Sequence, residues 1–365
     1  MTREDAISGV MLTVLCLVFW ITGFDGRAPG SPAEPQPPPA CPSHQRLAWE
    51  FGAGRGAFRF AAPPSWVWTN AADTAADPAG WRALGGFREE HLTLEIAWRR
   101  LDREIRVEDW IRYECRNLRL SESRVHAAAG RRPRTILAEV WDEESGSRRP
   151  GCLALSKLGD RLYRLRARIS PSAPPGTLAT LRETLATFQP LGSVASTCAE
   201  ELTTWRPFFG SELAVPYPSS WSPQDGPSWR QHPLLHLRSR SEGKNRGAML
   251  LCALEAREAV TELTDARLDE LVGVLAERER GLAIVEAQVW VDTEADSERL
   301  SGPGRLRILR LLRDGDPWEV QVRILTGAKA ALVLMLATPQ RESNPLAWMI
   351  HRAAFDLAAE EAREE

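Results

Sequence analysis

Two similar stretches of this chain, at residues 57–68 and 211–223, read AFRFAAPPSWVW and SELAVPYPSSWSP. Each begins with a short alternation of residues that predicts a β-strand, and each ends in prolines, serine and tryptophan, which terminate the strand. Pro64-Ser65-Trp66 corresponds to Pro218-Ser219-Ser220-Trp221, about 155 residues later. An interval of this length holds a complete domain, so the sequence predicts two similar domains in tandem.

The same order of predicted elements follows both stretches. In the first domain it is a strand at 91–100, a helix at 107–120, strands at 134–142, 151–158 and 161–169, and a helix at 177–188. In the second it is strands at 233–240 and 248–255, a helix at 264–280, strands at 284–294, 305–313, 318–325 and 330–338, and a helix from Asn344-Pro345 past Phe355. We therefore expect an α+β fold with two tandem antiparallel-sheet/helix sandwich domains, at residues 51–191 and 212–365, joined by a linker at 192–211.

The chain begins with an apolar segment. Residues 6–24 read AISGVMLTVLCLVFWITGF, about 19 residues without a charge, enough for a helix that spans a bilayer. We predict a transmembrane anchor over residues 1–26, with these side chains in the lipid: Ile7, Val10, Leu12, Leu15, Leu17, Phe19, Trp20 and Phe24. The alternatives are a cleaved signal peptide and a buried core helix, although the leading MTRED lacks the positive charge of a secretory signal. Residues 27–50 are rich in proline, which favours an extended, semi-rigid spacer.

The composition of the whole chain is that of a globular protein. Apolar residues make up 43% and charged residues 26%, close to the average of soluble domains. The formal net charge is −3, so no basic field points to nucleic acid. Nearly all of the positive charge is arginine, which is typical of a GC-rich bacterial genome.

Six cysteines occur, and none forms a CxxC pair that would indicate a zinc ribbon or a redox motif. Cys115, Cys152 and Cys252 lie in apolar-patterned elements, where we expect them to pack as small apolar side chains. Cys41 precedes the first predicted domain and Cys198 follows it, and the entry and exit of a domain are often close in space. A Cys41–Cys198 disulfide is therefore a hypothesis that fits an oxidising periplasm, with two surface thiols as the alternative.

The sequence contains no motif of a serine hydrolase, a zinc protease, a phosphate-binding loop or an EF-hand, so we predict no catalytic, cofactor-binding or metal-binding residue. His232 and His236 are four residues apart, the spacing of a metal pair on a helix. The strand predicted there instead separates them by about 13 Å.

Three arginines, Arg164, Arg166 and Arg168, share one face of the predicted strand at 161–169. They indicate a docking patch for an acidic partner surface or for lipid headgroups. The alternative is a solvated face whose charges pair with nearby acids such as Glu95 and Glu139.

The opening motifs FRFAAPPSW and LAVPYPSSW, the order of helix and strands, and the closing amphipathic helix resemble the PsbP/Mog-type fold, which is also found in DcrB-like bacterial proteins. The resemblance covers nearly all of residues 57–190 and 212–360, as two copies. It implies a protein that is not an enzyme and binds no cofactor, because members of this family are typically accessory subunits, assembly factors or chaperones. Tandem copies behind a membrane anchor depart from the usual single domain.

Together, the anchor, the spacer and the two domains predict a non-enzymatic accessory subunit that stabilises or helps assemble a larger membrane protein complex. We expect it on the periplasmic side of a bacterial inner or intracytoplasmic membrane, with the bilayer and other subunits of the complex as its partners. The resemblance alone makes a photosynthetic reaction-centre or antenna complex one candidate host. The alternatives are a DcrB-like periplasmic chaperone or secretion-associated factor, and a small-ligand receptor or enzyme, which would need a deep pocket with convergent polar groups.

Overall fold

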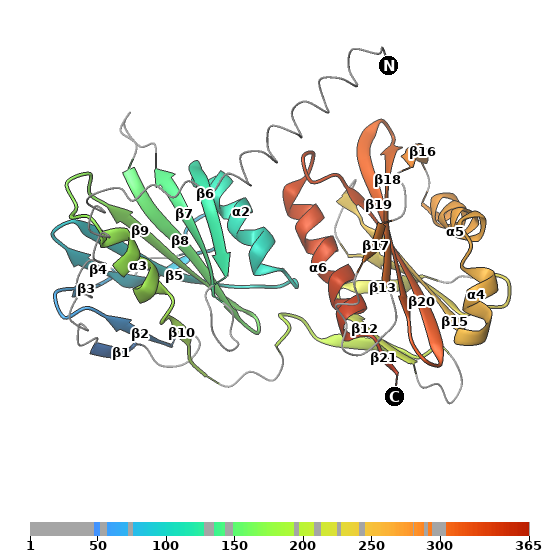
Figure 1. Ribbon diagram of the computed structural model, residues 1–365, viewed down its shortest axis with the longest axis horizontal. Coiled ribbons are helices and arrows are strands. Elements are labelled where there is room, and N and C mark those ends of the chain that lie inside the picture. Colours follow the sequence, from blue (N-terminus) through green and yellow to red (C-terminus); the bar gives the residue numbers. More distant parts are fainter. Residues whose placement is uncertain are drawn as a thin grey trace, which may run out of the picture. The chain divides into compact units, whose positions relative to one another are not determined.

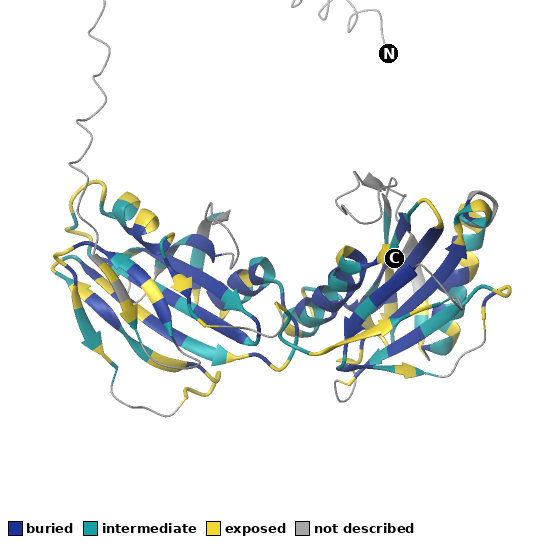
Figure 2. Ribbon diagram, turned by 90° about the horizontal axis from the view of Figure 1, so that it is seen from below, coloured by how far each residue is buried: buried dark blue, intermediate teal, exposed yellow. Residues whose placement is uncertain are grey.

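The fold is built from two wide antiparallel sheets with helices packed on them (Figure 1). The computed structural model describes residues 47–51, 57–71, 76–127, 135–142, 149–192, 197–207, 213–224, 228–240, 245–279, 281–287, 291–293 and 304–364. These residues belong to one unit, Arg46–Glu365. Buried residues run along the strands of both sheets, as the dark blue in Figure 2 shows.

The first domain contains a seven-stranded sheet in the order β3-β4-β5-β9-β8-β7-β6. Its strands are β3 (Val67–Asn70), β4 (Arg82–Glu89), β5 (Leu92–Arg100), β6 (Leu120–Ala127), β7 (Thr135–Asp142), β8 (Arg149–Leu158) and β9 (Arg161–Ile169). A second sheet of three strands has the order β1-β2-β10 and comprises β1 (Leu47–Phe51), β2 (Phe58–Ala62) and β10 (Gln189–Pro190). The two helices are α2 (Val107–Asn117) and α3 (Thr177–Leu185).

The two faces of this sheet are covered differently. One face packs against α3 and the three-stranded sheet through an aromatic core, in which Phe58 and Phe188 lie 5.2 Å apart and Phe60 and Phe87 lie 5.3 Å apart, measured between ring centroids. The other face packs against α2, whose buried side chains recur at three- and four-residue spacing: Val107, Trp110, Ile111, Glu114 and Cys115. Helix α2 lies over β6, β7 and β8.

The second domain repeats this plan with the strand order β13-β14-β15-β20-β19-β18-β16, and β17 pairs with β18 beside β16. The strands are β13 (Trp221–Gln224), β14 (Leu234–Ser239), β15 (Ala248–Glu255), β16 (Leu282–Ala287), β17 (Val291–Thr293), β18 (Gly304–Arg313), β19 (Asp316–Thr326) and β20 (Ala330–Pro339). The short strands β11 (Leu202–Trp205), β12 (Leu213–Pro218) and β21 (Arg363–Glu364) pair in the order β11-β12-β21. The helices are α4 (Ala256–Glu262), α5 (Asp265–Arg278) and α6 (Pro345–Glu361).

Each long helix of the second domain begins at a residue that caps it. The Asn344 side chain accepts a hydrogen bond of 3.1 Å from the backbone N–H of Ala347, with Pro345 in the first turn of α6. Thr264 accepts one of 3.4 Å from Arg267 at the start of α5. Helix α6 covers one face of the sheet, and α4 and α5 pack on the other. Strand β20 therefore lies between helices and is buried along its whole length.

The tandem arrangement of two sheet domains is confirmed, because the strand orders of the two sheets correspond strand for strand. The predicted single strand at 284–294 is divided into β16 and β17, which both pair with β18. Strand β1 lies in the stretch that the sequence assigned to the spacer, and β11 lies in the predicted linker. The predicted anchor lies outside the described residues, and no helix among the residues described is long and apolar enough to cross a membrane.

Helices α2 and α6 meet at a buried carboxylate. Asp356 of α6 is only 2% exposed, and its carboxylate contacts the guanidinium of Arg106, the residue before α2. Arg352, one turn earlier in α6, donates to both oxygens of Asp356 from Nε, at 3.0 and 2.9 Å, and Arg323 of β19 lies at 3.9 Å. Burial alone would lower the pKa of Arg106, but the charge of Asp356 outweighs it and the pKa is raised.

We expect Asp356→Asn to lower the free energy of unfolding by about 2–3 kcal/mol, because three arginines lose a buried counter-charge. Urea unfolding followed by circular dichroism measures this. Asp160→Asn is the matched control: Asp160 pairs with the largely exposed Arg100 at 3.0 Å, so its loss should cost less than about 1 kcal/mol. Equal effects of the two substitutions would contradict the importance of the Asp356 contact.

One histidine of the second domain, His351, is fully buried in the core. Its Nδ1 lies 3.0 Å from the hydroxyl of Thr338, and its ring packs edge-on to Trp221 with centroids 5.6 Å apart. The ring leaves no space for a side chain at Gly247, where a Cβ would lie 2.6 Å from Nδ1. Burial lowers the pKa of His351 to about 3, so the ring stays neutral in the folded protein at ordinary pH.

Stability should therefore fall as the pH drops below about 6.5, because the unfolded chain takes up a proton at His351 and the folded chain does not. Lowering the pH from 7 to 5 should reduce the free energy of unfolding by about 2 kcal/mol through His351. His351→Gln should lack that part of the decline, whatever its stability at pH 7. Denaturant unfolding of both proteins at the two pH values tests this, and parallel declines would contradict it.

Candidate functional site

Helix α2 leaves part of its face of the first sheet uncovered, and a recess of about 500 Å³ lies there over β3, β4, β5 and β9. Polar side chains from all four strands reach it, and Trp81, just before β4, forms part of its wall. The charged and hydroxyl-bearing side chains that line it are Thr69, Asp77, Arg88, Thr93, Glu95, Arg164 and Arg168.

Two glycines of β4 line the recess. Gly86 lies opposite Glu95, and a Cβ at Gly86 would come within 2.0 Å of the carbonyl oxygen of Leu94. Gly85 has a φ of +144°, a conformation that other residues rarely adopt, and the pairing of β4 with β5 shifts between Ala83 and Gly85. The close approach of β5 therefore excludes a side chain at Gly86, and Trp68 leaves no space for one at Gly85.

The structure places the three predicted arginines on one face of β9, alternating with buried residues, and all three are partly exposed. Arg164 and Arg168 line the recess. Arg166 lies between them on β9, opposite Glu95 of β5. The predicted row of arginines thus borders an open recess, in the middle of the sheet.

Arg164 differs from the other two because it joins α2 to the sheet. Its Nη1 donates to the buried carboxylate of Glu114 at 2.5 Å, and its guanidinium stacks 4.5 Å from the Trp81 ring. Arg99 extends the stack, at 5.7 Å from Trp81 and 5.2 Å from Trp110. Stacked guanidinium and indole groups of this kind hold a planar charged surface in a fixed orientation.

The acids that we expected near these arginines take different places. Glu95 lies beside Arg166 in the sheet, on the recess. Glu139 faces the opposite side of the sheet, where its carboxylate pairs with Arg182 of α3 at 3.1 Å. Glu95 therefore lies on the same face as the arginines, and Glu139 does not.

The sequence did not indicate Trp81 or Glu114 as parts of this site. Trp81 follows a turn and belongs to no apolar periodicity, and its indole N–H is buried without a hydrogen-bond acceptor among the described residues. Glu114 and Arg164 are 50 residues apart in the chain, so only the packing of α2 on β9 brings them together.

The remaining predicted positions play no part in the recess. Cys115, Cys152 and Cys252 are buried, as predicted, and burial raises the pKa of Cys152 and Cys252 to about 12. Cys198 is half-buried, and Cys41 lies outside the described residues, so the disulfide stays a prediction. Within the described ranges, no group of three histidines, cysteines or carboxylates is placed to hold a metal ion.

Neither a family model nor a curated protein matches this chain. Among solved structures it is similar to the cyanobacterial PsbP (CyanoP) of Synechocystis sp. PCC 6803, with 14% identity and a TM-score of 0.32 over 48% of this chain and 99% of that one. It is also similar to the immunity protein TplEi of the T6SS of Pseudomonas aeruginosa, with 13% identity and a TM-score of 0.22 over 87% of this chain and 97% of that one. A PsbP protein is thus among the similar structures.

The contact of Arg164 and the partial exposure of Arg168 predict unequal effects of their substitution on stability. Arg164→Ser should lower the free energy of unfolding by about 2–3 kcal/mol, because it leaves the carboxylate of Glu114 buried without its partner. Arg168→Ser should cost less than about 1 kcal/mol, because this side chain is partly exposed. Thermal and urea unfolding of the two variants measure the difference, and equal losses would contradict the assigned contacts.

Proposed function

We propose that this chain is a non-enzymatic accessory protein that binds an acidic surface of a larger membrane protein complex. The N-terminal segment holds it at a bacterial membrane, and the recess of the first domain is the binding surface. The observation that carries the proposal is the placement of Arg166 and Arg168 beside an open recess walled by the stacked Trp81. Arginine and tryptophan are the residues that dominate protein–protein contacts when they are fixed in this way.

Charge supports an acidic partner. The recess side of β9 carries three arginines, and Glu114 balances Arg164. Glu95, which is exposed, adds one negative charge opposite Arg166. A partner that presents carboxylates would add charge-assisted hydrogen bonds in a partly enclosed site, where such bonds are stronger than on an open surface.

A chaperone for apolar clients would expose a continuous apolar groove. Among the described residues, the large apolar side chains that are exposed belong to four separate elements: Val67, Leu202, Leu312 and Leu346. The polar recess therefore favours docking of a folded, charged surface over capture of an apolar segment. Anchoring beside the partner raises the effective concentration of the recess, so modest affinity is enough.

The experiment is mild-detergent extraction from the native membrane, followed by size separation and mass spectrometry. We expect the wild-type chain to migrate with a larger assembly, and Arg166→Ser/Arg168→Ser to migrate alone at moderate salt. This double variant retains Arg164 and therefore the buried pair with Glu114. The fold of the variant is checked by circular dichroism.

The matched control is Arg59→Ser/Arg100→Ser, which removes the same charge from the same domain. Both side chains are half-exposed or more and pair only at the surface, with Glu50 and Asp160. The control should stay with the assembly. Migration of the wild-type chain alone, or retention of the Arg166/Arg168 variant at the same moderate salt, would overturn the proposal.

A further inference from the structure

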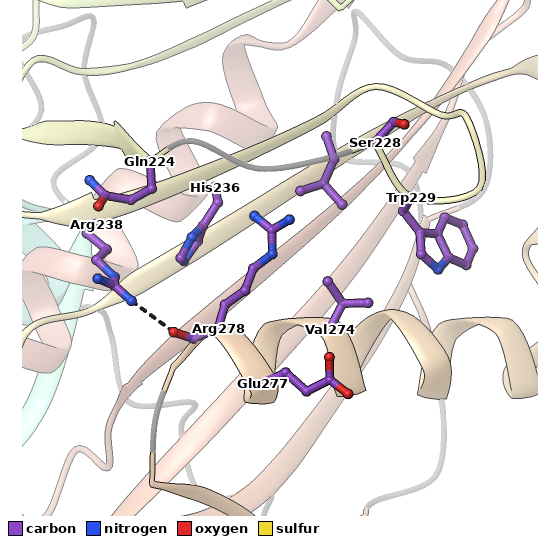
Figure 3. Close-up of a pocket in the computed structure, with 9 residues that line it drawn as sticks. Gln224, Ser228, Trp229, His236, Arg238, Val274, Glu277 and Arg278 are labelled. Atoms are coloured by element: carbon purple, nitrogen blue, oxygen red, sulfur yellow. Dashed lines mark hydrogen bonds between the residues drawn. The ribbon is translucent and has the colours of Figure 1, made fainter.

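The second domain has a hollow at the corresponding place, between β14 and the last turns of α5 (Figure 3). Its volume is about 690 Å³, and a neighbouring hollow of about 530 Å³ shares Arg238, Glu277 and Arg278 with it. Strand β14 corresponds to β4, and helix α5 corresponds to α2. In both domains, the sheet face on which this helix packs is therefore partly open near the same edge of the sheet. This site does not depend on the arginine face of the first domain.

The hollow has an apolar end and a cationic end. Trp229 lies at one end, with Val274 of α5 below it, whereas His236, Arg238 and Arg278 gather at the other (Figure 3). The alternation of β14 explains the order, because Leu234, His236 and Arg238 share the face toward α5 while Leu235 and Leu237 pack toward α6.

A buried carboxylate organises the cationic end. Glu279, 2% exposed, accepts from Nε of Arg238 at 2.7 Å and lies 3.1 Å from Nε2 of His236. Its second oxygen lies 3.5 Å from Nη2 of Arg313, whose guanidinium stacks on the Trp318 ring. Burial would raise the pKa of Glu279, but the contacts with His236 and Arg238 outweigh it and the pKa is lowered, so the group stays ionised.

Among the described residues that line this end, arginines outnumber acids. Four arginines line the two hollows, Arg238, Arg246, Arg278 and Arg313, and the acids that line them are Glu277 and Glu279. Arg238 also donates to the backbone carbonyl of Arg278 at 2.9 Å, which fixes the last turn of α5 against β14. Arginine side chains thus gather in a partly enclosed site that is continuous with an apolar wall.

We propose that this hollow binds a carboxylate that carries an adjacent apolar group. The carboxylate would lie at the cationic end, beside Arg278 and toward Arg246 of the neighbouring hollow, and the apolar group against Trp229 and Val274. The volume of the hollow is in the range of sites that bind a small ligand or a single peptide terminus. The same chemistry is available from the C-terminus of a polypeptide or from a free aryl or alkyl acid.

The test uses the full-length chain in lipid nanodiscs and fluorescence anisotropy of a fluorescein-labelled glycine–serine hexapeptide that ends in leucine. The free acid should bind, and its C-terminal amide should bind at least about tenfold more weakly, because the charge-assisted hydrogen bonds are lost. Displacement of the peptide by phenylbutyrate would identify free acids as sufficient ligands. If phenylbutyrate does not displace the peptide, the site would be assigned to polypeptide C-termini.

The variant Arg246→Gln/Arg278→Gln should weaken binding of the free acid by about tenfold or more. It spares Arg238 and Arg313, which hold the buried Glu279. Val274→Glu tests the apolar end independently and should have a similar effect. Arg257→Gln is the control, because this arginine of α4 is 78% exposed and lines neither hollow. Absence of binding, equal binding of acid and amide, or wild-type affinity in both variants would overturn the proposal.

Discussion

A wide β-sheet has two faces to cover, and one helix covers only a few of its strands. Strands lie about 4.8 Å apart, so seven of them span roughly 30 Å, whereas a helix with its side chains is about 10 Å wide. In the first domain, α3 and a three-stranded sheet cover one face, and α2 packs over β6, β7 and β8 on the other. The open recess at β4, β5 and β9 follows from this difference in width. The second hollow likewise lies near an edge of its sheet, between β14 and α5.

The contact between α2 and α6 depends on a second constraint, the cost of burying charge. Strand β19 alternates between an apolar face and a face that carries Glu319, Gln321 and Arg323. Helix α6 covers this polar face with polar partners: Trp348 donates to Glu319 at 2.8 Å, and Arg352 donates to Gln321. Asp356 then joins the cluster to Arg106. The buried polar groups are satisfied by one another, which specifies a single arrangement of these elements.

Much of the fold could be predicted from local pattern. The spacing of Trp110, Ile111 and Cys115 predicted a helix, and the alternation along β9 and β19 predicted strands and their faces. Strand β4 escaped prediction because its glycines and charges weaken the strand pattern. The closing helices and the repeated motif correctly indicated two domains of one plan.

The sites were only partly predictable, because their essential contacts join distant residues. The arginine row of β9 was visible in the sequence, but its partner Glu114 is 50 residues away. Arg106 and Asp356 are 250 residues apart in the chain, and Glu279 and Arg238 are 41 residues apart. No periodicity relates such pairs. They depend on how α2, α5 and α6 pack, which a single sequence does not express.

The most direct test of the central claim, that the open face of the first sheet is the binding surface, is photo-crosslinking in intact cells. Thr93 is exposed and lines the recess, so a photoreactive amino acid there would face a bound partner. The account predicts one discrete adduct of higher mass from position 93 and none from position 257, which is exposed on α4 of the other domain. An adduct from position 257 with none from position 93 would contradict it.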